Sequence, residues 1–344
     1  MTDRRTRRRF LAAAATATVA GAAGCGAFGD DDGNGADETT TAPRTTAEPS
    51  DYELRDPPTF DEPSQTVDGV ETFRGVGYAS APETDLLLDL HRPADRAGPA
   101  PLLVHVHGGG WAVGNRRWDR EGRRHANLGI AAATVDYRLS GEATYPAAVR
   151  DVVAAVTWLR REAAGPAGID PDRVVLIGES AGAHLSALVG NAGDLSNFQP
   201  PGVDGAADPV DGVVGISGIY HLTTEATDDE RLTNAFFGCT GSECPEEYRE
   251  GSPATYVEAA PPTLLYHGTD DQTVPYRAGT MYRDDLTEAG VPVELITGEG
   301  GGHVTPYEDP WGDRMRAAQR AFLAEHLSLD LNATTTTAAA RRQP

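Results

Sequence analysis

The chain has 344 residues, of which 39% are hydrophobic, and this is enough apolar material for a sizeable folded core. Its formal net charge is −23, and all 29 of its basic residues are Arg. So acidic a protein lacks the basic face that phosphate binding requires, and we exclude nucleic acid as a partner.

The first 24 residues differ in charge from the rest, because they hold five Arg and one Asp. The segment Thr6–Leu11, TRRRFL, fits a twin-arginine export signal, and an Ala-rich apolar run of about a dozen residues follows it. That run is too short to span a bilayer as a helix and matches the core of a signal peptide. We therefore expect a twin-arginine signal peptide over residues 1–24 and a mature domain outside the cytoplasm.

Cys25 follows the small residues Ala22, Ala23 and Gly24, as in a lipoprotein processing site. We expect lipidation of Cys25, which would anchor the protein at the cell surface. The alternatives are a plain secreted protein and an uncleaved helical anchor. Residues 25–50 are rich in Asp, Gly, Asn, Thr and Pro and predict a disordered acidic linker.

Beyond the first 24 residues the chain combines a large excess of carboxylates with a complete absence of Lys. This composition resembles that of proteins from salt-loving organisms, in which carboxylates keep the surface hydrated and salt screens their repulsion. We predict a halophilic protein, and the alternative is an ordinary acidic enzyme. The last residues, 329–344, contain four consecutive Thr and predict a disordered tail.

Between the linker and the tail, strand-like and helix-like segments alternate. Apolar runs predict strands over 86–90, 102–106, 130–135, 173–177, 210–216, 263–266 and 291–296. Amphipathic or Ala-rich patterns predict helices over 146–161, 181–190, 277–289 and 313–327. This alternation predicts an α/β domain over residues 51–328, with a mainly parallel central sheet and helices on both faces. Sites in such sheets lie beyond the carboxyl ends of the strands.

The alternation stops near 219–262, in a polar stretch that is too long for an ordinary connection. We expect a small insertion there, which is either a lid or wall over a pocket or a surface excursion. Cys239 and Cys244 lie within it, and outside the cytoplasm we expect them to form a disulfide rather than two free thiols. Two thiols alone are too few ligands for a metal site.

The motif GESAG at 178–182 lies between a predicted strand and a predicted helix. Small residues are needed beside Ser180 because larger side chains would collide across so sharp a turn. The helix that begins there points its N–H groups at the site, which favours a developing anion. These features predict Ser180 as a nucleophile, and the alternative is a chance match in a Gly-rich chain.

A serine hydroxyl needs a base, and an acid must orient that base, in the chain order Ser, Asp, His for this kind of turn. His303 follows the last predicted strand in a Gly-rich loop, and we predict it as the base. Asp271 follows the preceding strand, and we predict it as the acid, with Asp270 as its competitor.

A tetrahedral intermediate needs donors for its oxyanion. The motif HGGGW at 107–111 follows a predicted strand, and its glycines leave bare N–H groups close to a substrate. We predict an oxyanion hole formed by the N–H groups of Gly109, Gly110 and Ala181. His107 is expected to brace the loop rather than to act in catalysis.

The motifs HGGGW, DYRL, GESAG, HG-x-x-D-x-x-VP and GGGH, in this order, resemble the α/β-hydrolase superfamily. They are most similar to its esterase/lipase branch with an HGG-x-W oxyanion loop, which includes hormone-sensitive-lipase-like carboxylesterases and feruloyl-esterase-like proteins. The resemblance covers residues 70–327. It implies hydrolysis of carboxylic esters without a cofactor or metal, with Ser180, Asp271 and His303 as the triad. Glu179 departs from the pattern, because Asp is commoner there.

We therefore expect an exported serine hydrolase that cleaves small-molecule or polysaccharide esters through an acyl-enzyme, with membrane contact only through a lipid at Cys25. One alternative is an exo-peptidase or an arylformamidase-like amidase on the same fold. The other is a non-catalytic binding module. Such modules usually lose the nucleophile or the base, whereas this chain keeps both.

Overall fold

The computed structural model describes residues 52–118, 121–203, 209–222, 230–308 and 310–331. The predicted signal peptide over 1–24, Cys25 and the whole predicted linker over 25–50 lie outside the described residues. Of the predicted tail, only 329–331 are described. There Leu329 packs against the core and Leu331 is buried. The packed domain therefore extends past its predicted end at residue 328, because these two leucines are apolar.

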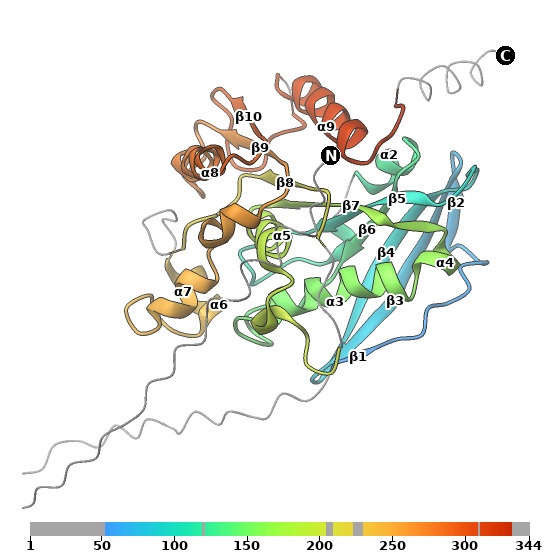
Figure 1. Cartoon of the computed structure of the whole chain (residues 1–344), viewed down its shortest axis with the longest axis horizontal. Coiled ribbons are helices and arrows are strands. Elements are labelled where there is room, and N and C mark those ends of the chain that lie inside the picture. Colours follow the sequence, from blue (N-terminus) through green and yellow to red (C-terminus); the bar gives the residue numbers. More distant parts are fainter. Residues whose placement is uncertain (1–51, 119–120, 204–208, 223–229, 309, 332–344) are drawn as a thin grey trace, which may run out of the picture. The chain divides into compact units, whose positions relative to one another are not determined.

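Within the described residues, ten strands form one mixed sheet in the order β1-β3-β4-β6-β5-β7-β8-β9-β10, with β2 paired to β3 (Figure 1). The strands are β1 Glu53–Leu54, β2 Gln65–Val67, β3 Val70–Ala81, β4 Thr84–Pro93, β5 Ala100–Val106, β6 Ala131–Val135, β7 Ile169–Glu179, β8 Gly212–Ile216, β9 Thr263–Gly268 and β10 Val293–Gly298. Strands β1 to β4 pair in antiparallel fashion, as does β4 with β6, and all the remaining pairs are parallel.

Helices connect the parallel strands and cover both faces of the sheet (Figure 1). The α-helices are α2 Gly122–Ala126, α3 Ala147–Arg161, α4 Ala164–Ala167, α5 Ala181–Ala192, α6 Glu230–Phe237, α7 Pro245–Glu250, α8 Arg277–Glu288 and α9 Gly312–His326. Short 3₁₀ helices occupy Arg116–Trp118, Ser196–Phe198 and Pro253–Ala259. The predicted helices and the strands of the parallel half agree with this arrangement to within a few residues.

The two layers of core follow from the two-residue period of a strand. In β7, Val174 and Leu176 pack on one face of the sheet, in the cluster that includes residues of α3 and α5. Val175 and Ile177 pack on the other face, in the cluster that includes Met315 of α9. The prediction of a mainly parallel sheet with helices on both faces is therefore confirmed.

The insertion near 219–262 contributes α6, α7 and the last 3₁₀ helix. Phe236, Phe237 and Tyr248 of this segment are buried and belong to the larger core cluster. The sequence left two interpretations of the insertion open, a lid or wall over a pocket and a loop that only extends over the surface. The burial of these aromatic side chains favours the wall.

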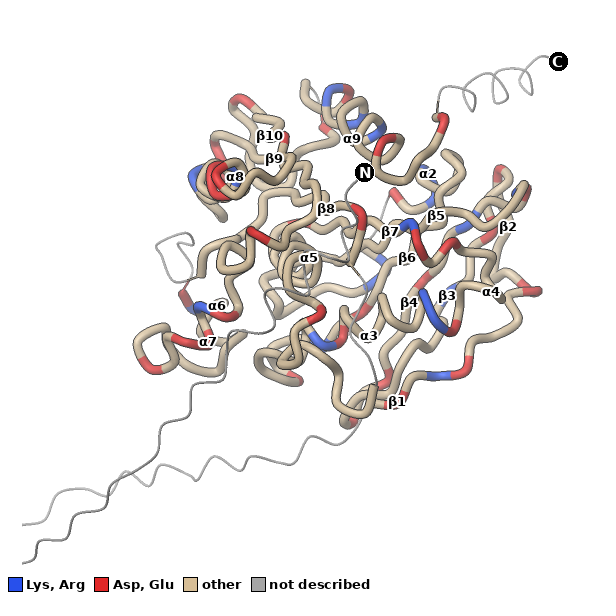
Figure 2. Tube along the Cα trace, in the orientation of Figure 1, with Lys and Arg blue, Asp and Glu red and all other residues tan. Residues whose placement is uncertain are grey.

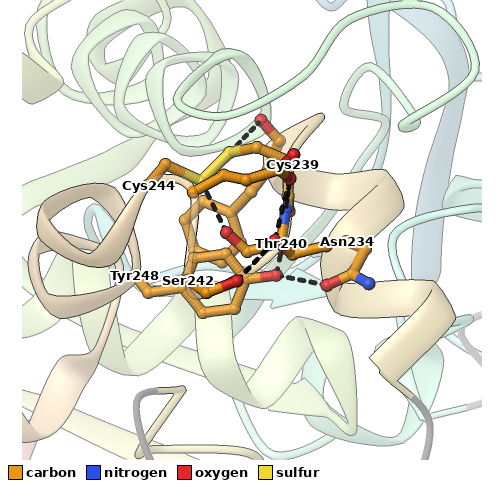
Figure 3. Close-up of a disulfide and its surroundings, with 8 residues drawn as sticks. Asn234, Cys239, Thr240, Ser242, Cys244 and Tyr248 are labelled. Carbon is orange, nitrogen blue, oxygen red and sulfur yellow. Dashed lines mark hydrogen bonds between the residues drawn. A yellow bond between two sulfur atoms is a disulfide. The ribbon is translucent and has the colours of Figure 1, made fainter.

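A disulfide joins Cys239 and Cys244 in the turn between α6 and α7 (Figure 3). The hydroxyl of Tyr248 donates to Asn234 Oδ1 at 2.7 Å and also lies 3.1 Å from the carbonyl oxygen of Cys239 (Figure 3). The phenol ring stacks on Phe237 at a centroid distance of 4.0 Å. The turn is thus fastened to both helices.

Carboxylates lie along the loops and helices of the described part of the chain, among them α7 and α8 (Figure 2). No described helix combines the length and the apolar character needed to cross a bilayer.

Candidate active site

Ser180 lies at the sharp turn between β7 and α5, with φ 53° and ψ −120°. A Cβ atom at Gly178 would lie 2.2 Å from the carbonyl oxygen of Gly182, and a Cβ at Gly182 would lie 2.0 Å from that of Val106. Only glycine fits at these two positions, which explains the GESAG motif. The N–H of Ser180 donates to the carbonyl oxygen of Ile216 at 2.8 Å, so the turn is fixed to the end of β8.

The carboxylate of Asp271 is fully buried in the loop after β9. Its Oδ1 accepts hydrogen bonds from the N–H groups of Thr273 and Val274, each at 2.9 Å. Its Oδ2 lies 2.7 Å from His303 Nδ1 and 3.4 Å from His267 Nε2. The structure thus places the predicted acid and the predicted base in direct contact.

Burial raises the pKa of Asp271, but hydrogen bonds from His267, His303 and the Val274 N–H outweigh burial and hold that pKa well below its usual range. The carboxylate therefore remains ionised at neutral pH. The competing Asp270 is exposed, and its carboxylate accepts a hydrogen bond from Thr269. Geometry selects Asp271 as the partner of the imidazole.

His303 is oriented by this contact, because Nδ1–H donates to the carboxylate and Nε2 is left with a lone pair. Hydrogen bonds join the loop that carries it to neighbouring loops. The N–H of Asp270 donates to the carbonyl oxygen of Gly301 at 2.9 Å, and the N–H of Val304 lies 3.3 Å from Ser217 Oγ. The loops after β9 and β10 therefore form one connected unit.

The loop after β5 requires glycine for two reasons. Gly109 and Gly110 adopt positive φ angles of 111° and 60°. A Cβ at Gly109 would lie 2.0 Å from the carbonyl oxygen of Val113, and one at Gly110 would lie 2.7 Å from Leu232. Within the described part of the chain, no backbone carbonyl accepts a hydrogen bond from the N–H of Gly109 or Gly110. Ala181 supplies the first N–H of α5.

His107 holds this loop in place through its contacts with Tyr137 and Gly108. Its ring stacks on Tyr137 of the DYRL motif at a centroid distance of 4.3 Å, and the Tyr137 hydroxyl donates to the His107 carbonyl at 2.9 Å. His107 Nδ1 lies 2.8 Å from the carbonyl oxygen of Gly108 and donates to it. Burial lowers the pKa of His107 to about 4, so the ring is neutral.

Ser180, His303 and the glycine loop line one cleft of about 830 Å³. Its other lining residues come from the insertion, from the 3₁₀ helix Arg116–Trp118, from the end of β7 and from the loops after β9 and β10: Trp118, Glu179, Ile219, Arg231, Leu232, Thr233, Gln272, Thr273, Val274 and Val304. Among the described contacts no hydrogen bond joins Ser180 Oγ to His303. Such contacts are often long before substrate binds and shorten when it does.

Sequence reasoning did not identify several of these residues. His267 belongs to the HG-x-x-D motif, and its spacing of four from Asp271 was the available signal. No sequence pattern identified Leu232 or Trp118 as cleft residues, because the sequence does not show which residues of an insertion or a loop reach the cleft. Trp118 is 51% exposed at the edge of the cleft.

Comparison with curated proteins finds relatives that are named as esterases. A probable isoprenylcysteine alpha-carbonyl methylesterase of Oryza sativa subsp. japonica is 29% identical over 254 residues, covering 70% of this chain and 60% of the relative. Esterase LipC of Mycobacterium tuberculosis is 33% identical over 222 residues, covering 62% of this chain and 54% of the relative. The chain thus spans little more than half the length of these curated relatives.

Among solved structures, the apo form of Thermogutta terrifontis esterase 2 superposes with a TM-score of 0.63 at 26% identity, covering 76% of this chain and 96% of that one. Another structure of that esterase is phosphorylated by paraoxon. The BD-FAE family model matches residues 88–286, which is more than half of the chain. This match, the fold and the esterase relatives agree, and the chain belongs to the BD-FAE family within the α/β-hydrolase esterase superfamily.

Proposed function

We propose that this protein is a serine hydrolase of carboxylic esters, with Ser180 as nucleophile, His303 as base and Asp271 as acid. The observation that carries the proposal is the part-buried Asp271–His303 hydrogen bond of 2.7 Å, whose imidazole lines the same cleft as Ser180. The esterase names of the relatives support it, as does the reaction of a similar esterase with paraoxon.

In the first half of the reaction, His303 Nε2 takes the proton of Ser180 as Oγ attacks the ester carbonyl. The N–H groups of Gly109, Gly110 and Ala181 hold the oxyanion of the tetrahedral intermediate. Its collapse breaks the bond to the alcohol, which leaves with the proton from His303. An acyl-enzyme remains on Ser180.

In the second half, His303 removes a proton from water as the water oxygen attacks the acyl-enzyme. The second intermediate collapses, the proton returns to Ser180, and the acid is released. Asp271 stabilises the imidazolium that forms in both halves. A small-molecule or polysaccharide ester fits an open cleft of this size, with no cofactor taking part in these steps.

The test compares wild type with Ser180→Ala on p-nitrophenyl acetate, p-nitrophenyl butyrate and a longer ester, beside an aminoacyl anilide. We expect ester turnover in wild type and a loss of at least ~10³-fold in kcat for Ser180→Ala. Ser186→Ala, a buried serine on the same helix whose hydroxyl has no hydrogen-bond partner among the described residues, is the matched control and keeps its activity.

Two results would contradict the proposal. The first is ester turnover by Ser180→Ala at the wild-type rate. The second is a wild type that neither hydrolyses esters nor becomes phosphorylated by paraoxon. Turnover of the anilide alone would instead favour a peptidase.

We also propose that the protein leaves the cell by the twin-arginine route, that it is lipid-anchored through Cys25, and that it works in strong salt. The N-terminal motif and the Lys-free acidic composition support this. A Cys25→Ser variant is expected to move from the membrane fraction to the soluble fraction, and its retention on the membrane would contradict the anchor.

A further inference from the structure

His184 is a buried imidazole that the proposed chemistry does not use. It lies in the first turn of α5. Its Nδ1 lies 3.1 Å from the indole Nε1 of Trp111, and its Nε2 lies 2.8 Å from the carbonyl oxygen of Gly251. An indole nitrogen only donates and a carbonyl oxygen only accepts, so Nδ1 must accept and Nε2 must carry the proton. Burial lowers the pKa of His184 to about 4 despite the hydrogen bond to Gly251, which agrees with this neutral tautomer.

The same residue is tied to the nucleophile through the backbone. The N–H of His184 donates to the carbonyl oxygen of Ser180 at 3.1 Å, so the imidazole and the nucleophile share one helical turn. Trp111 directly follows Gly110, whose N–H is a proposed oxyanion donor. The indole–imidazole hydrogen bond therefore connects the oxyanion loop to the turn that carries Ser180.

Trp111 adopts a backbone conformation that its surroundings must maintain, because φ is 57° for a bulky residue. Its indole is buried and stacks on Phe236 of α6 at a centroid distance of 4.7 Å. Phe236 also meets the His184 ring edge-to-face at 5.6 Å. The insertion thus contacts the Trp111–His184 pair through two residues, Phe236 and Gly251.

We propose that His184 is a positioning residue for the oxyanion hole, which sets the placement of Gly109 and Gly110 relative to Ser180 through its hydrogen bond to Trp111. This inference rests on the proposed esterase function. Oxyanion donors stabilise the transition state more than the bound substrate. Loss of the contact therefore lowers kcat and leaves KM nearly unchanged.

The experiment uses His184→Phe, Trp111→Phe and the double variant, with kcat and KM measured on p-nitrophenyl acetate. His184→Phe keeps an aromatic ring but removes both hydrogen bonds, and Trp111→Phe removes the indole N–H together with part of a ring that also lines the cleft. Titration with paraoxon, which phosphorylates the active serine, gives the concentration of active sites. The value of kcat is then calculated per active site, so misfolded protein does not lower it. His326→Phe, the same substitution on the distant helix α9, is the control.

We expect each single variant to lower kcat per active site by roughly 10- to 100-fold with KM within threefold. The double variant is expected to lose no more than the worse single variant, because both substitutions break the same hydrogen bond. His184→Gln, whose carboxamide both accepts and donates, is expected to recover part of the lost rate.

Wild-type kcat per active site in His184→Phe would overturn the inference, and so would fully multiplicative losses in the double variant. These outcomes require an active wild type, so they leave the proposed function intact. A wild type without ester turnover would instead be the failure of the proposed function itself.

Discussion

At the scale of single residues, the carboxylate of Asp271 has two kinds of partner. Backbone N–H groups of Thr273 and Val274 bind one oxygen, and two imidazoles face the other. The backbone contacts fix the position of the carboxylate, and the contact to His303 fixes the tautomer of the base. Position and tautomer are therefore controlled by separate oxygens of one side chain.

Asp271→Asn is expected to lower kcat/KM for p-nitrophenyl acetate by ~10⁴-fold, because an amide cannot stabilise the imidazolium and favours the wrong tautomer of His303. The neighbouring Asp270→Asn is a matched control, since that side chain is exposed. We expect it to stay within about twofold of wild type. Equal losses in the two variants, or a larger loss in Asp270→Asn, would refute the assignment of the acid.

At the scale of elements, sequence patterns identified the strands that are buried on both faces and missed the long strand β3. Its register against β4 shifts between Phe73 and Val76 and again between Gly77 and Ala79. Each irregularity breaks the alternation of inward and outward side chains, so no two-residue period is visible over 70–81. The parallel strands have no such breaks and stand out as short apolar runs.

The candidate site was predictable to the extent that its residues lie in local motifs. The strand–turn–helix around Ser180 and the order of Asp271 and His303 follow from such motifs. The contact of Leu232 with the glycine loop and that of Gly251 with His184 join segments more than 60 residues apart. Tertiary packing determines these contacts, and no local sequence pattern predicts them.

The turn between α6 and α7 supports a prediction about stability. In the chain-entropy model, a disulfide across a loop as short as Cys239–Cys244 stabilises the folded state by ~2 kcal/mol. Cys239→Ser/Cys244→Ser is therefore expected to lower the free energy of unfolding in denaturant by about that amount. Reductant should lower the wild-type midpoint toward that of the variant and leave the variant unchanged. A wild-type midpoint that is insensitive to reductant would contradict the prediction.

At the scale of the whole molecule, two buried neutral histidines make the fold sensitive to acid. Burial lowers the pKa of both His107 and His184 to about 4, whereas an unfolded histidine titrates near 6.5. Between these values the unfolded chain binds protons that the folded chain does not. The free energy of unfolding therefore falls as pH drops from about 6.5 toward 4, and each histidine contributes fully to stability only above that window.

The size of this effect is measurable by urea unfolding at constant high salt. Between pH 7 and pH 4.5, one such histidine accounts for a loss of roughly 2 to 3 kcal/mol. His184→Phe cannot bind that proton. Over the same pH interval its free energy of unfolding should therefore fall by roughly 2 to 3 kcal/mol less than that of wild type. His326→Phe, on α9, serves as the control. Identical pH slopes for wild type and His184→Phe would contradict the prediction.

The ladder between β8 and β9 has a consequence for how such a protein changes over evolution. Val213 to Ile216 pair residue by residue with Thr263 to Tyr266, although the whole insertion lies between them in the chain. This pairing aligns the end of β8 with the end of β9, the strand that precedes the loop of Asp271. Natural selection can therefore replace the intervening segment, and with it the preference for one ester over another. The pairing of β8 with β9 is kept when the segment is replaced. One constraint accompanies every such exchange: a replacement must still offer a carbonyl oxygen to the imidazole behind the nucleophile.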